Sequence, residues 1–232
     1  MELPLFHYLC PVIPDPTGDL TRNRRAVLDS PMKILIDNGH GILTKGKRSP
    51  DSKLLEYAYT RELARQIVTT LKARGYDSEL LVPEDDDIPL SERVRRTNAH
   101  CQALGKSNVI LISIHINAAG DGTKWMNATG WSCYTCKGQT QSDTLANCLY
   151  VAAIKNFPGR RIRTDYSDKD PDWEENFYIL RHSLCPAVLT ENFFMDSHSD
   201  LEYLQSKDGK QAVVDTHAEG IMEWLRVESS TD

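Results

Sequence analysis

Three side chains able to bind metal or transfer protons lie at the ends of apolar runs typical of buried strands. They are His40, His115 and Glu191. In an open α/β sheet, functional sites form where strands end and loops begin. The three side chains are therefore expected at one rim of a sheet, although each segment alone is a weak signal.

A fourth candidate, Glu56, lies at the start of an expected helix. It precedes residues of the helix's buried face by four, seven and eight positions, so its carboxylate is expected to point toward the sheet. A buried carboxylate needs a pairing partner or a metal. With His40 and His115 it would complete the three-ligand set of a catalytic zinc, leaving one position for water. Glu191 would then be available for proton transfer.

Each of these residues also has an ordinary structural interpretation. A lone histidine near a strand end is usually a hydrogen-bonded structural residue. Glu56 could pair with a lysine or arginine at the helix start, and Glu191 could be a simple rim residue. Their joint placement, in an order that matches a known family, favours the functional interpretation.

The elements that would position these residues follow from hydrophobic periodicity. Strands are predicted over residues 32–37, 78–82, 108–116, 131–135 and 187–191, and helices over 54–74, 91–104, 144–157 and 211–225. The alternation of strands and helices predicts an α/β fold, a single three-layer helix/sheet/helix domain with a mostly parallel central sheet. Residues 1–31 hold five of the eleven prolines and are predicted to be an irregular leader.

Composition excludes several classes of protein. With 40% hydrophobic and 26% charged residues, the chain is typical of a globular enzyme, and it contains no run of about 20 apolar residues that would predict a membrane span. A net charge of -6 offers no broad basic face for nucleic acid. Six scattered cysteines are expected to be free thiols, and Cys133 and Cys136 to be structural rather than a second metal site.

Several segments together resemble the zinc-dependent N-acetylmuramoyl-L-alanine amidases of the amidase-3 type, found in bacterial cell-wall hydrolases and phage endolysins. The resemblance covers about residues 33–225 and rests on residues 34–41, Glu56, 90–93 with Asn98, 113–118 and 186–191. It implies one zinc ion per chain held by His40, Glu56 and His115, with Glu191 as the catalytic acid. Two features depart from the family pattern, Asn38 in place of a proline and the Thr190-Glu191-Asn192 setting of the catalytic acid.

The resemblance implies hydrolysis of the amide bond that joins the lactyl group of N-acetylmuramic acid to L-alanine in peptidoglycan. The expected partners are the stem peptide and glycan of that polymer, and the oligomeric state stays open. Two alternatives remain, a catalytically silent peptidoglycan-binding module and another zinc peptidase or deacetylase on the same fold. The catalytic domain is expected over residues 32–228, with a tail at 229–232.

The sequence shows no export signal, because no basic residue precedes the short apolar run near the N-terminus and prolines interrupt it. Synthesis in the cytoplasm and action at the cell wall are expected, through phage-type release or a leader outside these residues. The remaining histidines are expected in surface or core roles: His7, His100, His182, His198 and His217. The acidic 164–176 stretch is expected to be a solvated surface loop, with shaping of a peptide groove as the alternative.

Overall fold

The computed structural model describes residues 32–230, so the predicted leader lies outside the described residues. Its strands are β1 (Lys33–Asn38), β2 (Asp77–Leu80), β3 (Val109–Asn117), β4 (Ser132–Thr135), β5 (Trp173–Glu174) and β6 (Ala187–Phe194). Its helices are α2 (Glu56–Ala73), α3 (Leu90–Leu104), the short 3-10 helix η1 (Lys106–Asn108), α4 (Gln141–Asn156), α5 (Tyr178–His182), α6 (His198–Gln205) and α7 (Lys207–Glu228).

All six strands form one sheet in the order β2-β1-β3-β6-β4-β5. The first four strands of this order are mutually parallel, β4 runs antiparallel to β6, and β5 is parallel to β4. The prediction of a mostly parallel sheet is confirmed. The carboxyl ends of β1, β3 and β6 consequently meet at one edge, which we call the catalytic edge.

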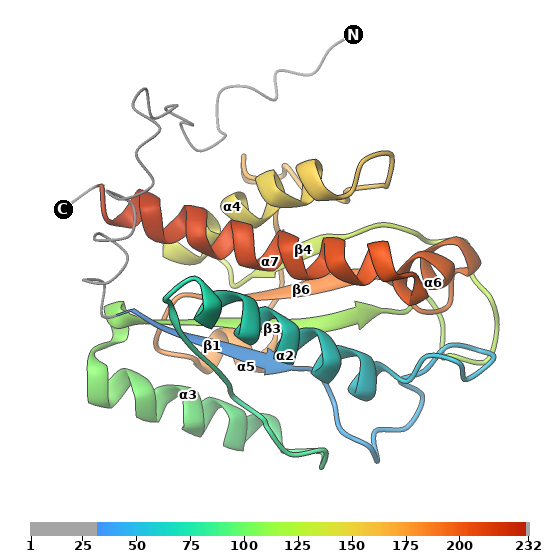
Figure 1. Cartoon of the computed structure of the whole chain (residues 1–232), viewed down its shortest axis with the longest axis horizontal. Helices are drawn as coiled ribbons and strands as arrows, with labels where there is room; N and C mark the ends of the chain where they lie inside the picture. Colours follow the sequence, from blue (N-terminus) through green and yellow to red (C-terminus); the bar gives the residue numbers. More distant parts are fainter. Residues whose placement is uncertain (1–31, 231–232) are drawn as a thin grey trace, which may run out of the picture.

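Helices cover both faces of the sheet (Figure 1). Helices α2, α4 and α7 pack on one face, where their apolar side chains join the even-numbered residues of β1 and β3 in the larger core. Helices α3 and α5 pack on the other face over a smaller core that includes Leu35 and Leu111. This arrangement confirms the three-layer prediction.

Local signals explain where helix α2 ends and where helix α4 begins. Helix α2 buries a stripe that includes Leu63, Ile67 and Leu71, and the following Gly75 adopts a φ of +91°, which glycine reaches without steric cost. Helix α4 begins with a capping box in which the Thr140 hydroxyl and the Asp143 carboxylate each accept a backbone N–H at the helix start.

The structure also differs from the sequence-based predictions. Strand β5 and helices α5 and α6 were not predicted. Strand β6 also continues beyond Glu191, where the predicted strand ended. The acidic 164–176 stretch is not simply a solvated loop, because Asp170 and Asp172 are buried. The prediction failed there because counting acidic residues cannot reveal a carboxylate that is enclosed by segments distant in sequence.

Two further expectations concern cysteines and membranes. Cys101, Cys133, Cys136 and Cys185 are free thiols, and Cys133 is buried within β4. Among residues 32–230, no helix has the length and apolarity required to cross a bilayer.

Candidate metal centre and active site

His40, Glu56 and His115 converge at the catalytic edge. One ligand atom from each residue lies within 4.8 Å of those of the other two. His40 Nε2 is 3.5 Å from Glu56 Oε2, and His115 Nδ1 is 3.3 Å from Glu56 Oε1. The two imidazole rings meet edge to face with centroids 5.0 Å apart. Glu56 therefore bridges the two histidines.

Glu56 is fully buried as the first residue of α2, where the positive end of the helix dipole favours an anion. Its Oε1 accepts a hydrogen bond of 3.0 Å from the backbone N–H of Ile116, while Oε2 has no hydrogen-bond partner. Burial alone would raise the pKa of Glu56, but the hydrogen bond and charge of His115 hold that pKa below its usual value. The result is an ionised carboxylate with one uncommitted oxygen facing His40.

His40 has an unusual backbone, with a φ of +62° in the left-handed region. The preceding Gly39 leaves room for His115, since a Cβ at residue 39 would lie 2.5 Å from atoms of the His115 ring. Burial lowers the pKa of His40 to about 4, so its imidazole is neutral at pH 7 and has a nitrogen lone pair for a metal.

Two buried arginines hold the loop that carries His40. Arg93 of α3 forms an ion pair with Asp37 and donates hydrogen bonds to the carbonyl oxygens of Asn38 and His40, at 2.6 and 3.0 Å. Arg61 of α2 donates to the same His40 carbonyl at 3.0 Å. Sequence reasoning noted Arg93 only as part of the family pattern and missed Arg61, whose place on a helix surface gave no signal of burial.

The 84–88 loop packs against the His40 loop through backbone contacts. Arg61 donates to the carbonyl oxygens of Glu84 and Asp86, at 2.9 and 3.3 Å. A Cβ at Gly41 would lie 2.2 Å from the Cα of Asp87, so only glycine permits this approach. The 84–88 loop thus buttresses the His40 loop from the side of α2 and α3.

Glu191 lies in register with His115 on the neighbouring parallel strand, and Ser132 of β4 lies opposite it on its other side. Its Oε2 is buried without a hydrogen-bond partner. Burial, aided by the negative charge of Glu56, raises the pKa of Glu191 to about 7. A carboxyl group with that pKa can both accept and release a proton near neutral pH.

A β-bulge follows this pair of residues. The register of β3 and β6 shifts after His115, and Phe193 adopts a φ of +66°. Asn192 secures the bulge, because its Nδ2 donates to the His115 carbonyl at 2.9 Å and its Oδ1 accepts from Trp131 Nε1 at 3.0 Å. The sequence gave no periodic signal for this irregularity.

A buried hydrogen-bond chain continues from Asn192 into α7. Asn192 Nδ2 donates to Thr190 Oγ1 at 3.1 Å, and Thr190 Oγ1 lies 2.8 Å from His217 Nε2. His217 Nδ1 must donate to the Val213 carbonyl, 2.7 Å away, because a carbonyl only accepts. Burial lowers the pKa of His217 to about 4, so Nε2 accepts from Thr190. Of the two roles expected for His217, surface or core, the structure shows the core one, beneath the strand that carries Glu191.

The donor set fits a zinc ion. Two histidines and one carboxylate are the ligands of a three-residue catalytic zinc site, and the uncommitted Glu56 Oε2 leaves a buried charge that a cation would compensate. The other histidines of the described residues, His100, His182, His198 and His217, lie outside this group.

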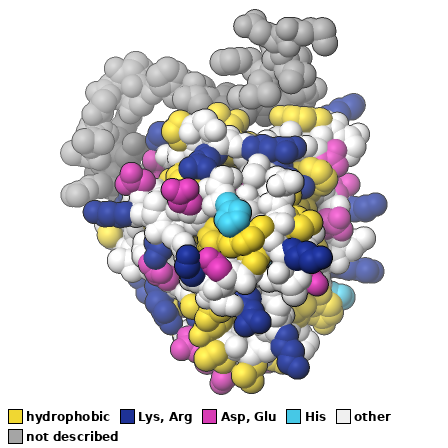
Figure 2. Space-filling view, turned by 90° about the vertical axis from the view of Figure 1, so that its right-hand side faces the viewer, with side chains coloured by type: hydrophobic (Ala, Val, Ile, Leu, Met, Phe, Trp, Pro, Cys, Tyr) yellow, Lys and Arg dark blue, Asp and Glu magenta, His cyan; other side chains and the backbone are white. Residues whose placement is uncertain are grey.

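The surface around the catalytic edge is mixed in character. Figure 2 looks on to this end of the molecule and shows a histidine near the middle, beside hydrophobic side chains and among basic and acidic ones.

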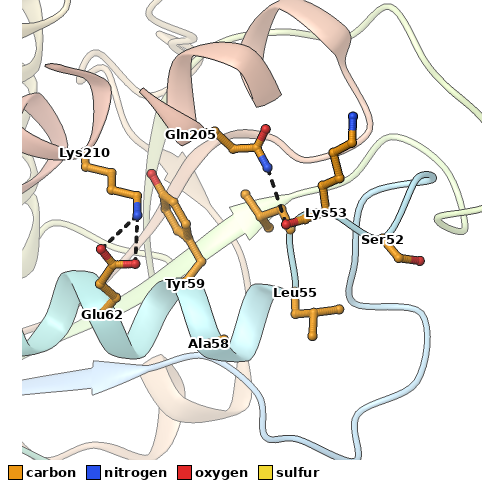
Figure 3. A pocket seen from close by; sticks show the side chains of 9 residues that line it. Ser52, Lys53, Leu55, Ala58, Tyr59, Glu62, Gln205 and Lys210 are labelled. Carbon is orange, nitrogen blue, oxygen red and sulfur yellow. Dashed lines mark hydrogen bonds and ion pairs between the residues drawn. The ribbon is translucent and has the colours of Figure 1, made fainter. Parts of the chain in front are cut away.

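A pocket of about 460 Å³ lies elsewhere, on the face of α2 toward α6 and α7, lined by Tyr59, Glu62 and Lys210 among others (Figure 3). It contains none of the four predicted site residues.

Comparison with known families decides the identity of the domain. The family model described as N-acetylmuramoyl-L-alanine amidase matches residues 34–223, a span that contains the whole His40, Glu56, His115 and Glu191 arrangement. The chain belongs to this family. The resemblance inferred from the sequence is thus confirmed, and so is the classification of this amidase as an enzyme.

Individual relatives support the same assignment. The endolysin of Bacillus phage SPP1 is 28% identical over 202 residues, which cover 85% of this amidase and 68% of the endolysin. The sporulation-specific N-acetylmuramoyl-L-alanine amidase of Bacillus subtilis (strain 168) is 27% identical over 193 residues, which cover 82% of this chain and 67% of that protein.

Solved structures share the fold. An N-acetylmuramoyl-L-alanine amidase from Clostridium difficile 630 superposes with a TM-score of 0.70 at 25% identity, covering 84% of this chain and 97% of that one. The catalytic domain of the amidase CwlV from Bacillus (Paenibacillus) polymyxa var. colistinus gives a TM-score of 0.70 at 23% identity, covering 84% and 99%. The α/β fold is therefore that of amidase catalytic domains.

Proposed function

We propose that this amidase hydrolyses the amide bond between the lactyl group of N-acetylmuramic acid and L-alanine in peptidoglycan, at a single zinc ion held by His40, Glu56 and His115. The observation that carries the proposal is the convergence of these three side chains beside Glu191 on the neighbouring strand. A bound zinc ion supplies Lewis acidity, which polarises the amide carbonyl and lowers the pKa of water from about 15.7 toward about 7.

The chain's own residues supply the proton transfers. Glu191, with a pKa of about 7, is suited to take a proton from the attacking water and to return it to the departing amine. One of its carboxylate oxygens, Oε2, is buried without a hydrogen-bond partner, so it is free to accept that proton. No side-chain nucleophile or covalent intermediate is needed.

The family assignment also supports action at the cell wall, where the enzyme would bind the stem peptide and the glycan of peptidoglycan. Product analysis tests the proposal. Purified peptidoglycan is digested with the wild-type chain and with Glu191→Gln, and the new amino termini are labelled and identified by mass spectrometry.

N-terminal L-alanine should be the dominant new end with the wild type only, and a chelator should abolish it until zinc is restored. New reducing sugars, or amines deeper in the stem peptide, would refute the lactyl-amide assignment. Peptidoglycan binding without any cleavage would identify the silent binding module instead.

A further inference from the structure

Three aspartates form a second buried cluster, which the catalytic proposal does not use. Asp143 lies in the first turn of α4, and Asp170 and Asp172 lie in the segment that leads into β5. Their exposed fractions are 4%, 7% and 1%. One oxygen from each lies within 4.8 Å of those of the other two.

The cluster lies at the end of the sheet opposite the catalytic edge. Asp172 Oδ2 accepts a hydrogen bond of 2.6 Å from Thr135, the last residue of β4. Because β4 runs antiparallel to β6, Thr135 lies toward the beginning of β6, whereas Ser132 lies opposite Glu191. The aspartates are therefore separate from the proposed zinc ligands.

Hydrogen bonds account for only part of the buried charge. Asp143 Oδ2 accepts from the Thr140 N–H and closes the capping box of α4, and Asp170 Oδ2 accepts from Gln139 at 2.6 Å. Asp143 Oδ1 lies 3.4 Å from the Thr135 hydroxyl oxygen. The last two oxygens, Oδ1 of Asp170 and Oδ1 of Asp172, are buried and accept no hydrogen bond from a donor group, and these two carboxyl groups interact directly with each other. These two buried oxygens are an observation separate from the clustering itself, and they require a shared proton or a cation as their partner.

No basic side chain compensates these carboxylates in the part of the chain that the structure describes. The ion pairs formed by residues 32–230 include none with Asp143, Asp170 or Asp172. Burying unpaired carboxylates is costly, and only a shared proton or a bound cation can reduce that cost.

The donor chemistry selects the cation. Three carboxylates and the Thr135 hydroxyl are all oxygen donors, which suit hard divalent cations rather than zinc. Mg²⁺ usually retains several waters, for which a site this enclosed has little room, whereas Ca²⁺ accepts flexible coordination by carboxylates.

We propose that Asp143, Asp170 and Asp172 bind one Ca²⁺ ion, which fastens the 164–177 segment to α4 and to the end of β4. Backbone contacts already bring these parts together, since Glu175 N–H donates to the Thr135 carbonyl at 2.9 Å. The cation would add a cross-link among segments distant in sequence, so its effect is on stability and not on the chemistry at Glu191.

The test uses the full chain with its zinc content unaltered. Thermal unfolding is followed while CaCl₂ is added, with NaCl of equal ionic strength and MgCl₂ as comparisons. Calcium at 100 times its dissociation constant should raise the melting temperature of the wild type by about 5 °C or more. Asp172→Asn and Asp170→Asn should each abolish the shift, while Asp165→Asn, in the same segment, should retain it.

A second readout reports occupancy directly. Tb³⁺, a luminescent substitute for Ca²⁺, should emit when Trp173 is excited, and Ca²⁺ should suppress that emission. The signal should persist in His115→Ala, which separates this site from the zinc centre, and disappear in Asp172→Asn. Absence of both the thermal shift and the emission in the wild type would overturn the proposal and leave a shared proton as the explanation. Stabilisation by Mg²⁺ but not Ca²⁺ would overturn the choice of calcium.

Discussion

His115 and Glu191 lie side by side, in register, on the adjacent parallel strands β3 and β6. Neighbouring strands lie about 4.8 Å apart, and side chains in register point to the same side of a sheet. The sheet itself therefore sets the separation of a proposed metal ligand and a proposed general base, with no contribution from a flexible loop. The bulge that follows ends this regular pairing immediately beyond the two residues.

Replacing Glu191 by glutamine separates proton transfer from metal binding. Glutamine preserves the shape of the side chain but cannot accept a proton, so amide cleavage should fall by at least ~100-fold. Zinc content, measured by elemental analysis, should stay near one per chain. Substantial residual cleavage would mean that another residue is the base.

Replacing His115 by alanine, in contrast, should remove the metal as well as the activity. Two remaining protein ligands hold zinc poorly, so occupancy after dialysis should fall sharply together with activity. His100→Ala is the matched control, because His100 pairs with Glu79 away from the ligand group. Full zinc content in His115→Ala would remove His115 from the proposed site.

Much of this architecture was predictable because it depends on local patterns. Apolar runs identified the parallel strands, and helical spacing identified Glu56 as inward-facing, as its complete burial in α2 confirms. The proximity of His40 and His115 follows from the rule that parallel strands place their carboxyl ends together, and Glu56 joins them from the start of α2. The roles of these residues in binding zinc stay predictions.

Other features depend on contacts that no local pattern encodes. The antiparallel direction of β4 results from pairing with a strand over fifty residues later in the chain. Arg61 is buried because its guanidinium donates hydrogen bonds to carbonyl groups of two separate loops. Asp172 is buried because Thr135 and helix α4 enclose it. A helix-surface arginine and an acidic segment ordinarily indicate solvent exposure, so both interpretations fail without the tertiary structure.

Arg93 is expected to position His40 without contacting substrate. A lysine ammonium cannot reproduce the planar fork that reaches Asp37 and the carbonyls of Asn38 and His40 together. Arg93→Lys should weaken zinc affinity by about 10–100-fold, the scale of lost support behind metal ligands. Competition with a chelating dye measures this affinity. Arg95→Lys, on the exposed side of the same helix, should leave it unchanged.

Asn192 links the bulge to the core, so its removal should affect stability. Asn192→Ala leaves the buried Trp131 indole N–H and the His115 carbonyl without their partner, which should lower the free energy of unfolding by about 1–3 kcal/mol. Urea denaturation measures this loss. Asn156→Ala, which removes a contact with Glu219 near the surface, should cost less. Equal losses in the two variants would show that the Asn192 contacts add no special stability.

The buried aspartates predict a pH dependence of stability in calcium-free protein. The pKa of Asp172 is about 8 in the folded chain and about 3.9 in an unfolded one. Between these values the folded state holds a proton that the unfolded state has released. The stabilisation is therefore complete below about pH 4 and is lost as the pH rises to about 8, by up to about 1.4 kcal/mol per pH unit.

Two carboxyl groups interact with Asp172, Asp170 in its own segment and Asp143 of α4, and the Thr135 hydroxyl donates to it. The Cys133 thiol of β4 and the Tyr150 phenol of α4 also interact with it, and burial raises the pKa of both groups, so they stay neutral over this pH range. Comparison with Asp172→Asn isolates this contribution, because other titrating groups, Glu191 among them, are common to both proteins. The difference between their unfolding free energies should change steadily from pH 5 to pH 8 without calcium. Calcium should selectively restore the wild type at high pH, since the cation binds the carboxylate that the proton has left. A difference that is flat across this range would mean that Asp172 ionises normally in the folded chain.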